Sequence, residues 1–264
     1  MSMKDYKGYL IDLDGTMYKG AERIEGASEF VEHLTTKNLP FMYLTNNSSK
    51  TVSQIAEKLN QIGVRARPEQ VYTSSIATAE YISSKKKQAR VFAIGEEGLF
   101  DALRQEGLEL VQEEADFVVI GIDREINYEK LASACLEVRK GASFISTNGD
   151  IAIPTERGLV PGNGAMTSVV SVSTGVDPVF VGKPESLIMS RALKRLGYNK
   201  EDVLMVGDNY NTDIKAGMTA GMDTLMVETG LSTFDEIKNK EHQPTYKCAD
   251  LFHWIQRMNS NEKT

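Results

Sequence analysis

A short apolar run, Gly8 to Ile11, ends in Asp12-Leu13-Asp14-Gly15-Thr16 and so carries two carboxylates into a turn. Side chains at positions i and i+2 of a strand share a face. Because the Gly-Thr turn ends this strand, the second carboxylate can swing back over the first. Carboxylates at the carboxyl end of a buried strand lie where open α/β sheets bind ligands. The pattern therefore predicts an α/β fold with an anionic site at a strand end.

Two buried carboxylates this close raise each other's pKa, so the pair needs a cation. Magnesium is the natural candidate, because it takes hard oxygen ligands and bridges protein carboxylates to a phosphate. For this one motif, a solvated turn after a strand is the alternative interpretation. An EF-hand loop fits less well, since Thr16, Met17 and Tyr18 stand where that loop needs a third oxygen ligand and a glycine.

Further apolar runs also end in polar residues. Phe41-Met42-Tyr43-Leu44 leads into Thr45 and Asn46, where a hydroxyl and successive backbone N–H groups ahead of a helix form an uncharged cradle for a phosphate. Val179-Phe180-Val181-Gly182 ends in Lys183 and a proline. Because proline cannot extend the strand, we expect the lysine at the tip of a third core strand.

A fourth run, Val203 to Val206, ends in Gly207-Asp208-Asn209-Tyr210-Asn211-Thr212-Asp213, which supplies a second acid pair. Taken alone, each of the four ends is more often a polar cap at a strand-to-helix turn. Their combination favours one phosphoryl-transfer site, in which magnesium and Lys183 supply the positive charge. A carboxylate in such a site can attack phosphorus and form an aspartyl phosphate.

The order DxDGT, TNNS, a lysine before proline, and GDNxxTD resembles the phosphatases of the haloacid dehalogenase superfamily. Within that superfamily the chain is similar, over nearly its whole length, to the NagD-type, p-nitrophenylphosphatase-like branch. The resemblance implies that Asp12 is the nucleophile and Asp14 the general acid and base. It also implies that Thr45 and Asn46 hold the transferring phosphoryl group, and that Lys183 balances its charge.

The same resemblance implies a magnesium site, formed by the Asp12 carboxylate, the Asp14 backbone carbonyl and Asp208, with Asp213 in support. An acid that works in both directions does best with a pKa near the working pH, and we expect the nearby carboxylates to raise the pKa of Asp14. An exposed charge is the alternative interpretation of Lys183. For Asp213, an ordinary position at a helix N-terminus is equally consistent.

The spacing of the motifs predicts a second domain, because 137 residues separate Thr45 from Lys183 and one crossover needs far fewer. This interval has its own alternation of strands and helices. We expect strands near 90–94, 108–111, 116–121 and 143–147, and helices near 97–106 and 127–140. The predicted fold is a doubly wound parallel, Rossmann-like core of residues 1–79 and 179–264, with an inserted α/β cap of residues 80–178. The resemblance agrees, since NagD-type phosphatases carry a class IIA cap at this point.

A cap would exclude water and contact the part of the substrate that is not phosphate. Residues 146–164 read as a long polar loop marked by glycine and proline, and such loops are more often functional than idle. Asn148 and Arg157 are the candidates for contacting a hydroxyl or a carboxylate, although an exposed loop charge also accounts for Arg157. Gly162 and Gly164 would let the backbone approach closely, or simply begin a helix.

The predicted function is a magnesium-dependent phosphatase for small phosphorylated metabolites. The chain as a whole resembles members called acid sugar phosphatases, which favours sugar or acid-sugar phosphates. Nucleoside monophosphates and phosphoglycolate are the alternatives. A phosphomutase would pass the phosphoryl group to a sugar in place of water. A phospho-acceptor signalling domain is disfavoured, because such domains are shorter and lack both a cap and an acid at the position of Asp14. The same acid disfavours a dehalogenase.

Composition excludes several other classes of function. The net charge of −7 argues against nucleic acid as a partner, since phosphate backbones require a basic surface. No apolar run approaches the roughly 18 residues that cross a bilayer, and Lys4, Asp5 and Lys7 interrupt any secretory segment, so we expect a cytoplasmic enzyme. Cys135 and Cys248 are too few for a disulfide framework or a zinc site, and the first reads as a packed thiol.

Overall fold

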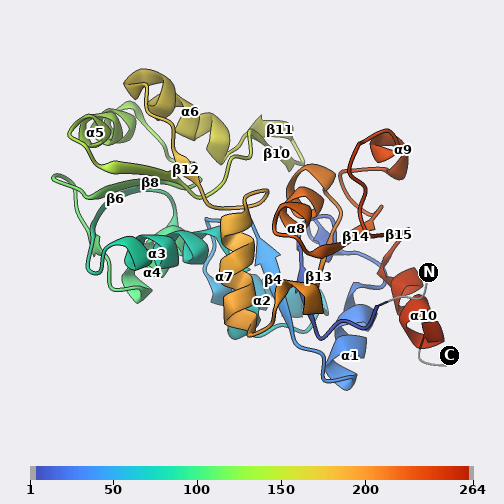
Figure 1. Ribbon diagram of the computed structural model, residues 1–264. Helices are drawn as coiled ribbons and strands as arrows, with labels where there is room; N and C mark the ends of the chain where they lie inside the picture. Colours follow the sequence, from blue (N-terminus) through green and yellow to red (C-terminus); the bar gives the residue numbers. More distant parts are fainter. Residues whose placement is uncertain (1–3, 262–264) are drawn as a thin grey trace. The chain divides into compact units, whose positions relative to one another are not determined.

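The computed structural model describes residues 4–261, which divide into two compact units (Figure 1). The core unit comprises the chain up to Thr45, Ser53–Tyr72 and the chain from Lys183 onward. The insert unit comprises Asn46–Val52 and Thr73–Gly182. No helix within residues 4–261 is long and apolar enough to cross a membrane.

The core unit is built on a six-stranded sheet in the order β15-β14-β13-β1-β4-β5. Its strands are β1 (Gly8–Ile11), β4 (Phe41–Thr45), β5 (Val71–Thr73), β13 (Val203–Gly207), β14 (Asp223–Val227) and β15 (Tyr246–Cys248). β1 pairs in parallel with β4 on one side and with β13 on the other, and β14 and β15 continue the parallel sheet beyond β13. The strand order therefore reverses between β1 and β13. Open α/β sheets bind ligands at such a switch point.

Every residue of β1, β4 and β13 is buried, as expected for apolar runs in a sheet with helices on both faces. The helices of this unit are α1 (Ala27–Thr36), α2 (Val52–Gln61), α7 (Ser186–Leu196), α8 (Lys215–Thr219), α9 (Phe234–Ile237) and α10 (Leu251–Asn261). Short 3-10 turns cover Pro68–Gln70 and Lys200–Asp202, a π-helical turn covers Tyr210–Ile214, and a small hairpin joins β2 (Tyr18–Lys19) to β3 (Glu22–Arg23).

The insert unit contains a second parallel sheet, in the order β12-β9-β8-β6-β7. Its strands are β6 (Arg90–Ile94), β7 (Glu109–Leu110), β8 (Phe117–Ile120), β9 (Ser143–Ser146) and β12 (Val179–Phe180). Helices α3 (Ser74–Lys85) and α4 (Glu97–Gln105) pack together on one face, and α5 (Tyr128–Arg139) and α6 (Asn163–Thr174) on the other (Figure 1). The predicted strands and helices of the interval are thus present. Cys135 is a free thiol on the buried face of α5, packed in the core of the insert unit.

The division between the units differs from the predicted boundaries at 79/80 and 178/179. Helix α3 spans the first of these and lies in the insert unit, because it packs against α4. Strand β12, expected as the third core strand, instead pairs in parallel with β9 of the insert sheet. The backbone pairing with the β9 segment continues beyond β12, since the Gly182 N–H donates to the Thr147 carbonyl at 2.8 Å. Lys183 is therefore the first core residue after the insert, and not the tip of a core strand.

The segment 146–164, expected as a long loop, contains the antiparallel hairpin of β10 (Ala152–Thr155) and β11 (Gly158–Pro161). The strand pattern is hidden in the sequence, because each strand contains a proline and the second begins with glycine. Both residue types are depleted in strands. A two-stranded hairpin tolerates proline, since both of its strands are edge strands.

The C-terminal helix α10 supports the core sheet through Trp254, which is fully buried and lies 5.1 Å from the ring of Tyr246. Trp254→Ala should lower the free energy of unfolding by about 3–5 kcal/mol, because it empties a large core position. Trp254→Phe should cost less, since the indole N–H has no hydrogen-bond partner among residues 4–261 to lose. Urea unfolding followed by circular dichroism measures both, with Phe252→Ala, 48% exposed on the same helix, as the control. Equal losses for Trp254→Ala and Phe252→Ala would contradict this role of the helix.

Candidate active site

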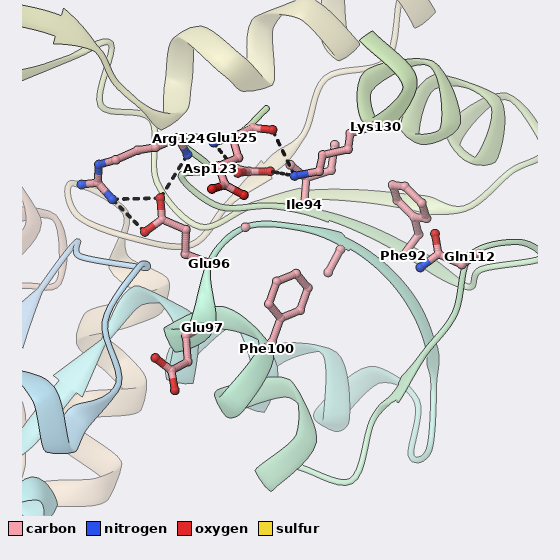
Figure 2. A pocket seen from close by; sticks show the side chains of 12 residues that line it. Phe92, Ile94, Glu96, Glu97, Phe100, Gln112, Asp123, Arg124, Glu125 and Lys130 are labelled. Carbon is pink, nitrogen blue, oxygen red and sulfur yellow. Dashed lines mark hydrogen bonds and ion pairs between the residues drawn. The ribbon is translucent and has the colours of Figure 1, made fainter. Parts of the chain in front are cut away.

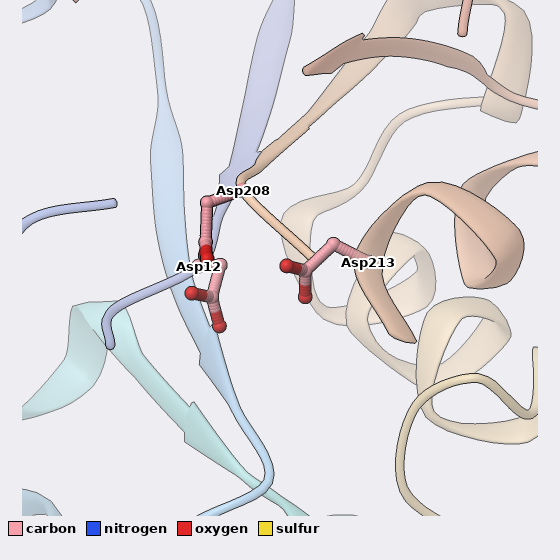
Figure 3. Close-up of side chains that lie close together, drawn as sticks. All are labelled: Asp12, Asp208 and Asp213. Atoms are coloured by element: carbon pink, nitrogen blue, oxygen red, sulfur yellow. The ribbon is translucent and has the colours of Figure 1, made fainter. Parts of the chain in front are cut away.

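Three buried carboxylates converge at the carboxyl edge of the core sheet (Figure 3). Asp12 follows β1, Asp208 follows β13, and Asp213 lies in the π-helical turn after that strand. One oxygen from each lies within 4.8 Å of the others. Because β1 and β13 are neighbouring parallel strands, their carboxyl ends bring Asp12 and Asp208 together at the switch point of the sheet.

Lys183 supplies a positive charge to this cluster. Its Nζ donates to Asp12 Oδ1 at 2.5 Å, to Asp213 Oδ1 at 2.7 Å and to the Leu44 carbonyl at 3.1 Å. The side chain is 2% exposed, and desolvation by itself would lower its pKa. The adjacent carboxylates of Asp12 and Asp213 outweigh desolvation and raise the pKa of Lys183, so the ammonium stays charged. The alternative interpretation of Lys183 as a surface charge is therefore wrong.

Three carboxylates against one ammonium leave a formal excess of two negative charges in the cluster. Burial, followed by the charge of Asp213, raises the pKa of Asp12 well above its usual range. The same two causes raise the pKa of Asp208 to about 6. A divalent cation would remove the excess, and an all-oxygen set of donors is the kind that Mg²⁺ prefers. The residues present therefore fit a magnesium ion.

Asp208 is held by two loops at once. Thr16 Oγ1 donates to Asp208 Oδ1 at 3.2 Å, and the Leu231 N–H donates to Oδ2 at 2.7 Å. A Cβ at Gly15, where φ is +93°, would lie 2.4 Å from Asp208 Oδ2, and a Cβ at Gly230 would lie 1.9 Å from it. Glycine is therefore required at both positions, because the backbone approaches the carboxylate so closely.

The loop of residues 229–232 was missed in the sequence analysis. Thr229 Oγ1 donates to the Gly15 carbonyl at 2.7 Å, which ties this loop to the turn that carries the first acid pair. The sequence signal was the apolar run Thr224 to Val227 followed by Glu-Thr-Gly, another strand end of the same kind. The charged residue at this strand end, Glu228, accepts a hydrogen bond from the Phe234 N–H at 2.6 Å. The loop instead reaches the site through a hydroxyl and a backbone N–H, which a sequence motif does not reveal.

Asp14 lies outside the three-carboxylate cluster, in the turn after β1, and its side chain is exposed to solvent. Its carboxylate accepts a hydrogen bond from the Tyr18 hydroxyl at 3.2 Å. Desolvation by the surrounding protein raises its pKa, against the opposing effects of Lys58 and Tyr18. The expected direction of the shift is confirmed, but desolvation, and not the neighbouring carboxylates, is its main cause. Lys58 and Tyr18 are further neighbours that the motif did not indicate.

Thr45 is buried at the end of β4, the neighbour of β1 in the core sheet. Asn46, the next residue, belongs to the insert unit. Its Nδ2 donates to both carboxylate oxygens of Asp150, at 3.3 and 3.2 Å. Its carbonyl accepts from Asn148 Nδ2 at 2.9 Å and from Ser74 Oγ at 2.8 Å. Within the insert unit, Asn148 thus holds the backbone of Asn46, and its contact with substrate stays a prediction.

Arg157 lies in the exposed turn of the hairpin β10–β11, where its N–H donates to Thr155 Oγ1 at 3.2 Å. The two glycines near the hairpin serve a close approach within the insert unit itself. A Cβ at Gly162 would lie 2.1 Å from the Asp150 carbonyl oxygen, and a Cβ at Gly164 would lie 2.4 Å from that of Gly149. The hairpin can therefore close against the start of α6.

Two family models match the chain, the first from the core unit into the insert unit and the second across the C-terminal part of the core unit. The model described as haloacid dehalogenase-like hydrolase matches residues 9–109, and the HAD-hydrolase-like model matches residues 180–253. The chain belongs to the haloacid dehalogenase-like hydrolases. These two matches contain all four motifs on which the resemblance rested, from Asp12 to Asp213.

Named relatives show to which branch of the family the chain belongs. The chain is 57% identical to 5'-nucleotidase YutF from Bacillus subtilis, over 96% of this chain and 99% of that protein. It is 55% identical to an acid sugar phosphatase from Staphylococcus aureus, over 94% and 96%. The crystal structure of a putative p-nitrophenyl phosphatase from Bacillus subtilis matches with a TM-score of 0.91 and 55% identity, over 98% of this chain and 99% of that one. The chain is a phosphatase of the NagD-type, class IIA branch.

The cluster generates a prediction for stability. Lys183→Met should destabilise the protein by about 3–5 kcal/mol in the presence of EDTA, because it leaves Asp12 and Asp213 buried without their ammonium. Magnesium should restore more of the unfolding temperature to this variant than it adds to the parent protein. Thermal unfolding with EDTA and with magnesium measures both effects, and Lys194→Met, at an exposed position of α7, is the control. An unfolding temperature equal to that of the control would contradict the charge balance described above.

Proposed function

We propose that the chain is a magnesium-dependent phosphatase that hydrolyses small phosphorylated metabolites through an aspartyl phosphate on Asp12. The observation that carries this proposal is the buried cluster of Asp12, Asp208 and Asp213, bridged by Lys183, at the switch point of the core sheet. Phosphoryl transfer requires a positioned nucleophile and neutralisation of the phosphoryl oxygens. The cluster combines a carboxylate nucleophile with an ammonium at hydrogen-bond distance.

The residues proposed to hold Mg²⁺ are the Asp12 carboxylate, the Asp14 backbone carbonyl and Asp208, with Asp213 in support. The support for this set is its oxygen chemistry and the excess of negative charge in the cluster. When bound, the ion would stabilise the charge that develops on the phosphoryl oxygens. Asp208 suits a ligand position because Thr16 and the Leu231 N–H fix its carboxylate before any ion arrives.

The carboxylate of Asp12 forms a bond to phosphorus as the bond from phosphorus to the substrate oxygen breaks. Asp14 gives a proton to that leaving oxygen. It then takes a proton from the water that attacks the aspartyl phosphate, which releases phosphate and restores Asp12. Lys183 orients the nucleophile through its hydrogen bond to Asp12 Oδ1. Since Asp14 is exposed to solvent, it can exchange protons with water between turnovers.

Thr45 and Asn46 are the proposed donors to the phosphoryl oxygens. Thr45 is suited by its place at the end of β4, beside β1. Asn46 follows directly in the chain, and its carboxamide is oriented by Asp150. Asn148 and Arg157 are the proposed contacts to the remainder of the substrate. Of these, Arg157 has the exposed guanidinium that could bind a carboxylate with two parallel hydrogen bonds.

We favour sugar or acid-sugar phosphates as substrates, which the name of the Staphylococcus aureus relative supports. The name of the Bacillus subtilis relative supports nucleoside monophosphates as the second candidate. Phosphoglycolate stays an alternative substrate, and phosphomutase activity and a role as phospho-acceptor are more remote. The negative net charge continues to disfavour nucleic acid, and a cytoplasmic location stays a prediction.

The first test removes the nucleophile. Asp12→Asn should lower phosphate release by at least about a thousandfold, because an amide at this position cannot form the aspartyl phosphate. Release is measured on a panel of acid-sugar phosphates, neutral sugar phosphates and nucleoside 5'-monophosphates, with magnesium or with EDTA. EDTA should abolish turnover of the parent protein, and Asp235→Asn, exposed in α9, is the matched control. A residual Asp12→Asn rate within about tenfold of the parent would disprove the assignment.

The second test separates the two catalytic acids. Asp14→Asn should slow alkyl phosphates, including sugar phosphates, much more than p-nitrophenyl phosphate, because a good leaving group needs little protonation. Single-turnover measurements isolate this first step from the later hydrolysis of the intermediate. Similar losses on both substrate classes would rule out Asp14 as the acid that protonates the leaving group.

A further inference from the structure

The insert sheet has a switch point of its own. Its chain begins with β6, adds β7 on one side and then returns to add β8 on the other, so the strand order reverses between β6 and β8. Helix α4 leaves β6 toward one face of the sheet, and α5 leaves β8 toward the other (Figure 1). Such a reversal opens a crevice at the carboxyl ends of the two strands, where α/β sheets bind ligands. The phosphatase reaction proposed above makes no use of it.

A cavity of about 570 Å³ lies at this switch point (Figure 2). Its wall includes Ile94 to Glu97, at the end of β6, and Asp123 to Glu125, just beyond β8. Phe92 and Phe100 contribute aromatic rings, and Lys130 reaches it from α5. The volume falls within the roughly 300–1,000 Å³ of small-molecule sites. All lining residues belong to the insert unit.

Ion pairs fix the shape of the rim. Arg124 Nη1 donates to both oxygens of Glu96, at 2.9 and 2.8 Å, and the Arg124 N–H donates to Glu96 Oε1 at 3.0 Å. Lys130 Nζ donates to Asp123 at 2.7 Å, and this carboxylate is only 4% exposed. The Glu125 N–H donates to the same carboxylate at 2.9 Å. The loops after β6 and β8 are thus joined to each other, and a preorganised rim lowers the entropy cost of binding.

The chemistry of the wall selects for one sign of charge. The lining contains four carboxylates and two cationic side chains, which gives it a formal net charge of −2. Glu96 and Asp123 are paired across the rim, whereas Glu125 extends an exposed side chain. The negative field favours a cation and disfavours an anion. Phe100 provides the main apolar surface, because Phe92 and Ile94 are only 5% and 2% exposed. An aromatic face also attracts an ammonium group.

We propose that the crevice between β6 and β8 is a second small-molecule site, which binds an organic amine with an apolar or aromatic body. The body packs against Phe100, which is half-buried on α4, and the ammonium group lies toward Glu125.

The test titrates the full chain with 2-phenylethylamine by ligand-observed NMR and calorimetry, with magnesium present. Phenylacetate is the matched anion. We expect saturable binding of the amine with a Kd of about 1 mM or lower, at least about tenfold tighter than that of phenylacetate. Glu125→Lys should weaken the amine by about tenfold or more and strengthen phenylacetate. Phe100→Ala should weaken both compounds.

Glu129→Lys is the control for charge, because it makes the same change at an exposed position of α5 outside the cavity. It should leave the amine affinity within about twofold of the parent. Three results would overturn the proposal: no saturable amine binding below about 10 mM, equal effects of Glu125→Lys and Glu129→Lys, or amine binding that survives Glu125→Lys and is lost in Asp208→Asn. The last result would place the amine at the acid cluster.

Discussion

The buried ammonium of Lys183, between Asp12 and Asp213, is the interaction on which the rest of the site depends. Buried carboxylates lower the stability of the fold unless a counter-charge is near. The neighbouring parallel strands β1 and β13 bring two of them together at their carboxyl ends. One lysine reduces the excess of charge without removing it. The remaining negative charge favours a divalent cation, which the carboxylate oxygens can ligate. A phosphoryl group in turn finds a carboxylate nucleophile and an ammonium within hydrogen-bond reach of each other.

The parts of this arrangement that follow from local pattern could be predicted from the sequence. The apolar runs of β1, β4 and β13 are buried strands, and because parallel strands share a carboxyl edge, the polar residues after β1 and β13 meet. Strand β12 could not be assigned in this way, since a short apolar run pairs with whichever sheet edge tertiary packing offers it. The hairpin β10–β11 was obscured by proline. The loop at Gly230 could not be predicted because it reaches the site through a hydroxyl and a backbone N–H.

The two sheets use the same topology for different chemistry. At the core switch point, buried carboxylates outnumber the one ammonium, and the family matches identify a phosphatase. At the insert switch point, Arg124 and Lys130 pair with Glu96 and Asp123 beside the ring of Phe100, so the rim is ordered while the lining keeps a net charge of −2. The first arrangement favours a bound dication and reaction. The second favours reversible binding of an organic cation.

The central claim is that the phosphoryl group passes through the carboxylate of Asp12. The most direct measurement is acid quenching during turnover, followed by borohydride reduction and peptide mass spectrometry, because borohydride converts an aspartyl phosphate to homoserine. The account predicts homoserine at position 12 in the parent protein, dependent on both substrate and magnesium, and none in Asp12→Asn. Homoserine at another aspartate, or none at position 12 while a burst of product shows that an intermediate accumulates, would contradict it.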